Sequence, residues 1–260
     1  MKVLFIGDVT GKPGRRLIAG RLAALRRAHA LDVVIANGEN AAGGMGITPD
    51  AAAELFAAGV DVLTGGNHIW HHREAYDLLD SDPRVLRPAN YPPGAPGRGA
   101  AVMRTPGGVQ VGVLNLEGRV FMQQLDDPFR IAREQAETLR ASVPAVIVDF
   151  HAEATSEKVA MGWYLDGRVS AVVGTHTHVQ TADERILPGG TAYISDAGMT
   201  GPRDGVIGMA REAILERFLT QLPARFQVAS GPVQLNGVLI SIAGDGRAEH
   251  IERLQIVAEA

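Results

Sequence analysis

Short runs of apolar residues recur along the chain, and polar residues follow each run. Residues 3–6 read Val-Leu-Phe-Ile before Gly7-Asp8, and residues 33–36 read Val-Val-Ile-Ala before Asn37. A strand that is covered on both faces needs no alternation of polar and apolar side chains. The pattern therefore predicts five buried strands with polar residues at their carboxyl ends, over residues 3–6, 33–36, 60–63, 145–148 and 171–173.

The segments between these strands carry helical patterns. Apolar residues recur at helical spacing over 17–28, and Thr48-Pro49-Asp50 is typical of a helix N-terminus. Alternating strands and helices predict an α/β fold with layered sheets, in a single domain spanning residues 1–260. Further helices are expected over 72–79, 129–139, 155–165 and 211–222.

The remaining segments complete the predicted sheets. Two apolar runs flank Asp245-Gly246 and predict a closing β-hairpin over 238–257. Residues 109–116 and 191–195 are expected to be strands, and the segment 88–108, rich in proline and glycine, is interpreted as a loop crossing.

Composition narrows the function classes. A net charge of -4 argues against binding to duplex nucleic acid. The chain has no cysteine, so disulfides, thiolate nucleophiles and iron–sulfur clusters are excluded, and any metal must bind nitrogen or oxygen ligands. No run approaches the roughly 20 apolar residues of a membrane span, and no signal-peptide pattern opens the sequence. We therefore expect a cytoplasmic protein, and a homo-oligomer is left open.

Metal-ligating residue types gather at the carboxyl ends of the predicted strands, where layered α/β proteins bind ligands. Carboxylates, amides and imidazoles together suit first-row divalent metals. Two such ions about 3.5–4 Å apart, bridged by a carboxylate and a hydroxide, perform phosphoryl chemistry. The number of ligands favours two ions over one, and the residues are Asp8, Glu39, Asn40, Asn67, His68, His151, His176 and His178.

Each of these residues has a structural interpretation when it is taken alone. Aspartate after a strand commonly caps a helix, and Asn40 or Asn67 would suit a turn. His151 alone would suit a hydrogen-bonded position in the core. Their joint occurrence at the ends of five strands favours a metal centre, because ligand types that cluster in one cleft are interpreted together.

The same motifs, in the same order, resemble those of the calcineurin-like metallophosphoesterases. They are Gly7-Asp8, 37–40, Gly66-Asn67-His68, His151 and 174–178. The chain departs from that pattern twice. Thr10 stands where the first histidine ligand would be, and Glu39-Asn40 replaces the usual aspartate motif. With residues 115–119 and 195–202, these departures resemble the bacterial YmdB-like branch.

The resemblance implies a four-layer α/β/β/α sandwich with mixed sheets, a dinuclear site usually described with iron, and phosphodiesterase activity that includes 2′,3′-cyclic nucleotides. Carried over by position, one ion would be held by Asp8, Asn40 and His178, and the other by Asn67, His151 and His176. Glu39 would bridge the two. Loss of the usual first histidine leaves the metal, divalent or mixed-valence, open between iron and manganese.

His68 follows the ligand Asn67, and we predict that it is the general acid that protonates the leaving group. The alternative is a residue that only orients a metal ligand. At the level of function, the leading hypothesis is a metal-dependent hydrolase of small phosphodiesters. A phosphomonoesterase on the same centre, and a regulatory module that binds a nucleotide and keeps its metals as structure, are the alternatives.

Overall fold

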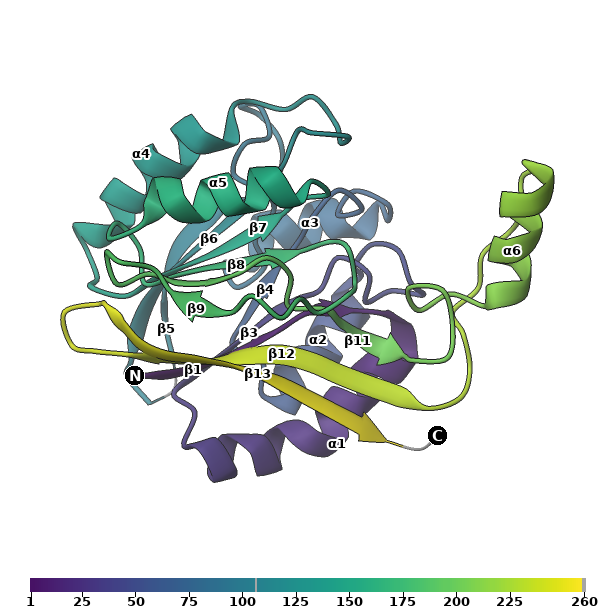
Figure 1. Cartoon of the computed structure of the whole chain (residues 1–260), viewed down its shortest axis with the longest axis horizontal. Helices are drawn as coiled ribbons and strands as arrows, with labels where there is room; N and C mark the ends of the chain where they lie inside the picture. The colour runs from purple at the N-terminus through teal and green to yellow at the C-terminus, as the bar shows by residue number, and fades with distance from the viewer. Residues whose placement is uncertain (106, 259–260) are drawn as a thin grey trace.

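Two mixed β-sheets form the centre of the fold in the computed structural model, which describes residues 1–105 and 107–258 (Figure 1). The first sheet has the order β2-β11-β12-β1-β3-β4, with β13 paired to β12. Within it β1, β3 and β4 are parallel, and β12 runs antiparallel to β1. The bounds are β1 Lys2–Ile6, β2 Asp8–Val9, β3 Val33–Asn37, β4 Val62–Thr64, β11 Met199–Pro202, β12 Val233–Ile242 and β13 Ala248–Ala258.

The second sheet has the order β5-β6-β7-β8-β10-β9. Its four central strands are parallel, whereas the two edge strands, β5 and β9, pair antiparallel to their neighbours. The bounds are β5 Ala100–Arg104, β6 Gln110–Glu117, β7 Val146–His151, β8 Ala171–Thr175, β9 Arg185–Ile186 and β10 Ala192–Ile194.

Helices cover the outer faces of both sheets (Figure 1). Helices α1 (Gly11–His29), α2 (Pro49–Ala58) and α3 (Glu74–Ser81) pack on the first sheet, and α4 (Pro128–Arg140) and α5 (Thr155–Leu165) pack on the second. Helix α6 (Arg211–Thr220) stands apart from the body on an arm. Among the described residues, no helix is both long and apolar enough to cross a membrane.

Alternation along the strands explains the layers. Successive side chains of a strand point to opposite faces, so Val3 and Phe5 of β1 face the second sheet while Leu4 and Ile6 face the helices. The apolar residues accordingly form three buried layers, one under each set of helices and one between the sheets. The predicted four-layer α/β/β/α sandwich is confirmed.

Most predicted elements lie where the sequence places them, with shifted ends. The prediction for residues 88–108 is wrong in part, because β5 forms there as an edge strand whose side chains are mostly half-buried or exposed. The strand predicted over 60–63 starts at Val62, because Gly59 adopts a left-handed conformation that ends α2. Helix α1 begins at Gly11, before the apolar positions that predicted it.

Candidate metal centre

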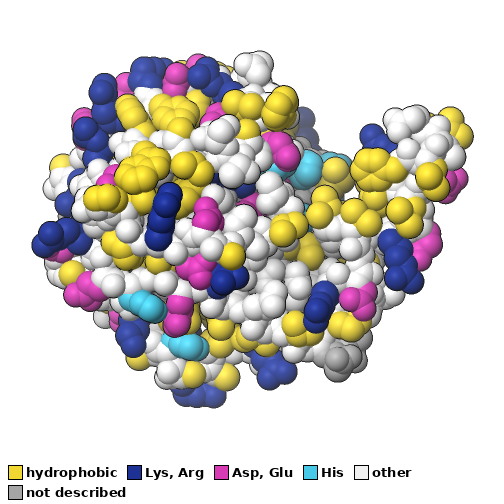
Figure 2. Space-filling view, in the orientation of Figure 1, with side chains coloured by type: hydrophobic (Ala, Val, Ile, Leu, Met, Phe, Trp, Pro, Cys, Tyr) yellow, Lys and Arg dark blue, Asp and Glu magenta, His cyan; other side chains and the backbone are white. Residues whose placement is uncertain are grey.

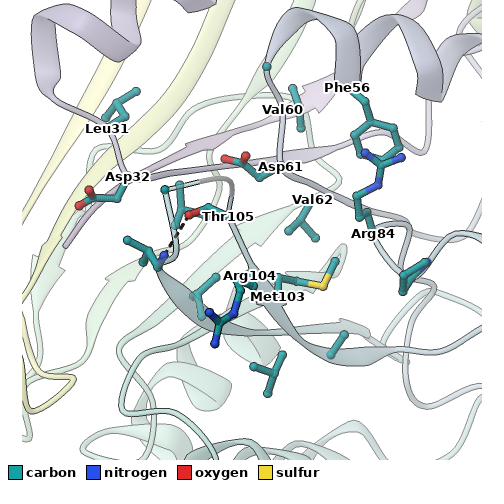
Figure 3. A pocket seen from close by; sticks show the side chains of 18 of the residues that line it. Leu31, Asp32, Phe56, Val60, Asp61, Val62, Arg84, Met103, Arg104 and Thr105 are labelled. Atoms are coloured by element: carbon teal, nitrogen blue, oxygen red, sulfur yellow. Dashed lines mark hydrogen bonds between the residues drawn. The ribbon is translucent and has the colours of Figure 1, made fainter.

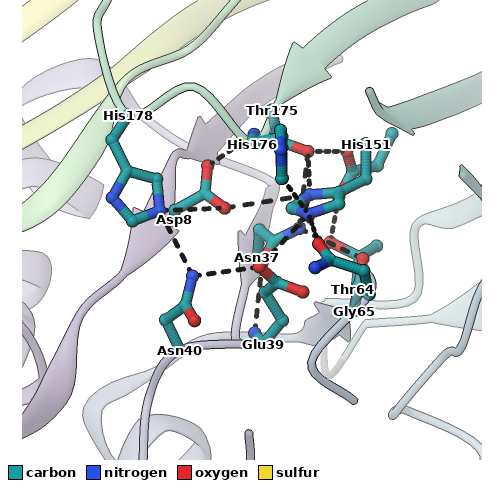
Figure 4. A network of polar contacts seen from close by, with 12 residues as sticks. Asp8, Asn37, Glu39, Asn40, Thr64, Gly65, His151, Thr175, His176 and His178 are labelled. Atoms are coloured by element: carbon teal, nitrogen blue, oxygen red, sulfur yellow. Dashed lines mark hydrogen bonds and ion pairs between the residues drawn. The ribbon is translucent and has the colours of Figure 1, made fainter. Parts of the chain in front are cut away.

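The carboxyl ends of five parallel strands meet where the two sheets face each other. Asp8 follows β1, Glu39 and Asn40 follow β3, and Asn67 and His68 follow β4. From the second sheet, His151 ends β7, and His176 and His178 follow β8. Figure 4 shows the labelled members of this set pointing toward one another. In the space-filling view, histidine side chains are visible in the notch between the body and the α6 arm (Figure 2).

Three donor atoms lie about 3 Å from a fourth, His151 Nε2, on one side of the cluster. His151 Nε2 lies 3.0 Å from Asn67 Oδ1, 3.0 Å from His176 Nδ1 and 3.1 Å from Glu39 Oε1. The ligand atoms of Glu39, His151 and His176 all lie within 4.8 Å of one another. Donors about 2.1 Å from an ion and at right angles to one another lie about 3 Å apart. The spacing therefore fits a single ion held by these four side chains.

A second group of donors lies on the Asp8 side. His178 Nε2 is 3.8 Å from Asp8 Oδ1 and 3.2 Å from the amide nitrogen of Asn40. The Asn40 amide presents its nitrogen here, and a half-turn would present its oxygen to a metal ion at the expense of the contact between Oδ1 and His68. Asp8 is fully buried, and its Oδ1 has no hydrogen-bond partner among the described residues. A buried carboxylate oxygen without a donor is costly unless a cation compensates it, so this group also fits a metal ion.

Glu39 lies between the two groups. Its Oε1 is 3.1 Å from His151 Nε2 and accepts a hydrogen bond of 3.0 Å from the Asn40 amide. Its Oε2 accepts a hydrogen bond from the backbone N–H of His68 at 3.0 Å, which fixes the carboxylate plane. The side chain is 1% exposed. This position is the one that a bridging carboxylate would occupy.

Comparison with known proteins agrees with the motifs and the fold. The sequence profile described as YmdB-like protein matches residues 4–254. The chain belongs to the YmdB-like family. A 2′,3′-cyclic-nucleotide 2′-phosphodiesterase of Bacillus subtilis (strain 168) is 51% identical over 257 residues, which cover 98% of this chain and 97% of that protein.

Two solved structures have the same fold over nearly their whole length. A protein of Thermus thermophilus, described as hypothetical, superposes with a TM-score of 0.92 at 46% identity and covers 100% of this chain and 99% of its own. A structure from Mycoplasma pneumoniae, described as a novel phosphatase, superposes with a TM-score of 0.93 at 35% identity. The superposition covers 100% of this chain and 94% of that one. The family match over residues 4–254 spans every strand end that carries one of these side chains.

In this YmdB-like chain, two glycines allow the strand ends to approach. A Cβ atom on Gly66 would lie 2.4 Å from both Glu39 Oε2 and His151 Nε2, so a larger residue there would enter the donor cluster. A Cβ atom on Gly174 would lie 1.8 Å from the backbone oxygen of Ser195. Glycine is required at both positions because the neighbouring atoms are backbone or site atoms.

The two histidines after β8 are held in an uncommon backbone conformation. His176 and His178 have φ angles of 101° and 68°, a region that L-residues seldom adopt. Between them, Thr177 donates through its backbone N–H and its hydroxyl to Asp196, at 3.0 and 2.8 Å. Lys158 donates to the same Asp196 oxygen at 2.7 Å, and both partners of this pair are almost fully buried. The pair anchors the turn that separates the two histidine rings.

Sequence reasoning missed Lys158 and Asp196 as contributors to the site. Lys158 lies on the inner face of α5, and its burial could have been suspected because it is one of only three lysines in the chain and falls on the apolar side of a helix. The contact with a residue 38 positions away has no local signal. Thr10, in contrast, lies as the sequence suggests: its hydroxyl faces the backbone oxygen of Asp8 at 3.4 Å and is not among the donors.

The surroundings in the cluster shift the pKa values of His151 and His176 in opposite directions. Burial disfavours a charged ring, but the carboxylates of Glu39 and Asp8 outweigh it and raise the pKa of His151 to about 10. Burial and the neighbouring His151 lower the pKa of His176 to about 3. In the protein without a bound cation, a proton on His151 thus offsets part of the negative charge.

His68 borders the cluster without joining it. Its Nδ1 is 3.1 Å from Asn40 Oδ1 and 3.5 Å from Glu39 Oε1, and a third of the side chain is exposed. The hydrogen bond with Glu39 raises the pKa of His68 against the effect of burial, which favours the neutral ring. A partly exposed imidazole beside the donor cluster, with its pKa raised, has the position that a general acid needs.

A separate cavity of about 1020 Å³ lies at the other end of the strands (Figure 3). Residues before β3 and β4 line it together with strand β5. Two of its four arginines, Arg26 and Arg84, pair with Asp61 and Asp82, and Arg84 also stacks on Phe56. Among the described residues that line it there is no histidine and no side-chain amide, so we assign the chemistry to the donor cluster.

Proposed function

We propose that this chain is a metal-dependent phosphodiesterase that hydrolyses small phosphodiesters, with 2′,3′-cyclic nucleotides as the substrate class. The observation that carries the proposal is the cluster of seven side chains at the strand ends, in which ligand atoms lie 3.0–3.8 Å apart on both sides of Glu39. The membership in the YmdB-like family and the name of the Bacillus subtilis relative support the choice of a phosphodiester substrate.

The residues divide into two proposed ligand sets. Asn67, His151 and His176 would hold one ion, Asp8, Asn40 and His178 would hold the other, and Glu39 would contact both. When bound, the two ions supply positive charge for the phosphate oxygens and lower the pKa of a bound water. Iron and manganese both suit this mixture of imidazole and oxygen donors.

His68 completes the proposed reaction. Water adds its oxygen to phosphorus, one P–O ester bond breaks, and the departing sugar oxygen takes a proton. His68 is placed to donate that proton, because Glu39 and Asn40 hold its ring beside the cluster while the side chain stays partly open to solvent. Water then restores the proton to the imidazole.

A substrate panel tests the proposal. The protein is purified without oxygen, its metals are quantified, and it is assayed with manganese or iron on 2′,3′-cyclic AMP, bis-p-nitrophenyl phosphate and p-nitrophenyl phosphate. We expect faster turnover of the two diesters than of the monoester. Preference for the monoester would instead support the phosphomonoesterase, and absence of turnover on all three would support the regulatory module.

Two further expectations belong to this proposal. The negative net charge leads us to propose that duplex nucleic acid is not a substrate. Cytoplasmic location stays a prediction, and a homo-oligomer is left open.

A further inference from the structure

A buried polar network lies around His151 Nδ1, the ring nitrogen that is 3.8 Å from Asp8 Oδ1 and on the opposite side of the ring from the Nε2 atom described above. His151 and Asp149 are alternate residues of β7, and Thr175 on β8 is paired in register with His151. Asn37 and Thr64, at the ends of β3 and β4, reach the same network from the first sheet (Figure 4). All five side chains are at most 1% exposed.

Asp149 receives hydrogen bonds from three neighbouring side chains. Thr175 Oγ1 lies 2.7 Å from Asp149 Oδ1, and the Asn37 amide donates to Asp149 Oδ2 at 3.0 Å. The Thr64 hydroxyl donates to the same Oδ2. A carboxylate accepts hydrogen bonds through both oxygens when it is ionised, and this arrangement of three donors suits that state.

The number of hydrogens that the neighbours can donate fixes the direction of the hydrogen bond between Thr175 and His151. The second amide hydrogen of Asn37 is donated to the backbone oxygen of Gly65 at 3.2 Å, which leaves none for His151. Thr175 has one hydroxyl hydrogen and donates it to Asp149. Since Thr175 Oγ1 also lies 2.9 Å from His151 Nδ1, that oxygen must accept a hydrogen bond from an Nδ1–H.

We propose that Asp149, acting through Thr175, is a positioning device that holds a proton on His151 Nδ1 and directs the Nε2 lone pair to the metal position. The far side of the ring agrees with this direction, because Nε2 is the atom that lies about 3 Å from Asn67, Glu39 and His176. Partners of this kind fix the tautomer and the ring angle of metal-binding histidines. The inference rests on the metal centre proposed above.

The test uses zinc alone, which binds without redox chemistry and leaves the NMR spectrum readable. In the zinc-loaded wild-type protein, a proton on His151 Nδ1 that is protected from solvent exchange is expected. A His151 proton found on Nε2 would overturn the inference. Failure of zinc to bind the wild-type protein would defeat the metal centre itself, so the two failures are distinguishable.

Three substitutions separate positioning from simple packing. Thr175→Val keeps the shape and removes the acceptor, and calorimetric titration of the metal-free protein with zinc is expected to show an affinity about 10–100-fold lower. Asp149→Asn is expected to do the same, whereas Thr175→Ser keeps the hydroxyl and the wild-type affinity. Unchanged zinc affinity in folded Thr175→Val protein would contradict the role.

Thr191→Val is the matched control. Thr191 is as fully buried as Thr175, and its hydroxyl donates to the backbone oxygen of Val169 at 2.6 Å, outside the Asp149 network. Wild-type zinc affinity and a retained Nδ1 proton are expected for this variant. A loss as large as that of Thr175→Val would show that the effect does not depend on the contact with His151 and would overturn the inference.

Discussion

At the scale of single residues, the eight candidate site residues differ in the contacts that hold their side chains in position. Glu39 is set by a backbone hydrogen bond from the turn after β4, and His68 is set by its contacts with Glu39 and Asn40. One carboxylate therefore links the ligand sets to the residue that we assign as the acid. Substitutions at these two positions should separate metal binding from proton transfer.

Replacing His68 by alanine should leave both metals bound while turnover falls by about 10²–10⁴-fold. The reason is that His68 borders the donors without being one of them. The loss should be smaller with p-nitrophenyl esters, whose leaving group needs little protonation. Equal turnover of 2′,3′-cyclic AMP by the variant and the wild type would remove His68 from the role.

Replacing Glu39 by glutamine should remove metal as well as activity. The amide keeps the shape, but it takes away the negative charge that lies between the two donor groups. Elemental analysis of the purified variant checks this expectation. Two ions per chain in the variant would show that Glu39 is not the bridge.

At the scale of elements, the sequence predicts best the buried strands whose residues are apolar on both faces. Residues 3–6 and 33–36 are apolar on both faces because one face meets helices and the other meets the second sheet. Short strands such as β2, β9 and β11 have two to four residues and carry no such pattern. Helix α6 was predicted because its signal is local, although the sequence says nothing of its place on an arm.

The site was predictable only in part, for a related reason. Ligands at the ends of strands converge because parallel strands end at one edge, which is a property of the fold class. The supporting contacts join distant residues: 38 positions separate Lys158 from Asp196, and 112 separate Asn37 from Asp149. Such pairs depend on the packing of one element against another and leave no pattern in the local sequence.

The buried pair of Lys158 and Asp196, which anchors the turn after β8, leads to a prediction about stability. Asp196→Asn keeps the size of the side chain but leaves Lys158 buried without its counter-charge, and removing one partner of a buried pair typically costs about 3–5 kcal/mol. Urea unfolding should show this loss, together with weaker metal binding at His176 and His178. The exposed pair of Arg247 and Asp245 is the control, and Asp245→Asn should leave the unfolding midpoint unchanged. Equal midpoints for both variants would contradict the anchoring role.

At the scale of the whole molecule, the apolar layer between the two sheets fixes the distance between the strand ends of the first sheet and those of the second. Phe5 is fully buried in that layer, and Phe5→Ala should cost about 3–5 kcal/mol of unfolding free energy. Phe218 on the α6 arm is 72% exposed, so Phe218→Ala should cost less than about 0.5 kcal/mol. Denaturant curves that show similar losses for both would contradict this assignment of the core.

The position of bound metal tests the central claim most directly. Crystals of the protein soaked in manganese, measured for anomalous scattering, should show two peaks in each chain. One is expected among Asn67, His151, His176 and Glu39, and the other among Asp8, Asn40, His178 and Glu39. A single peak, or peaks away from these side chains, would contradict the account.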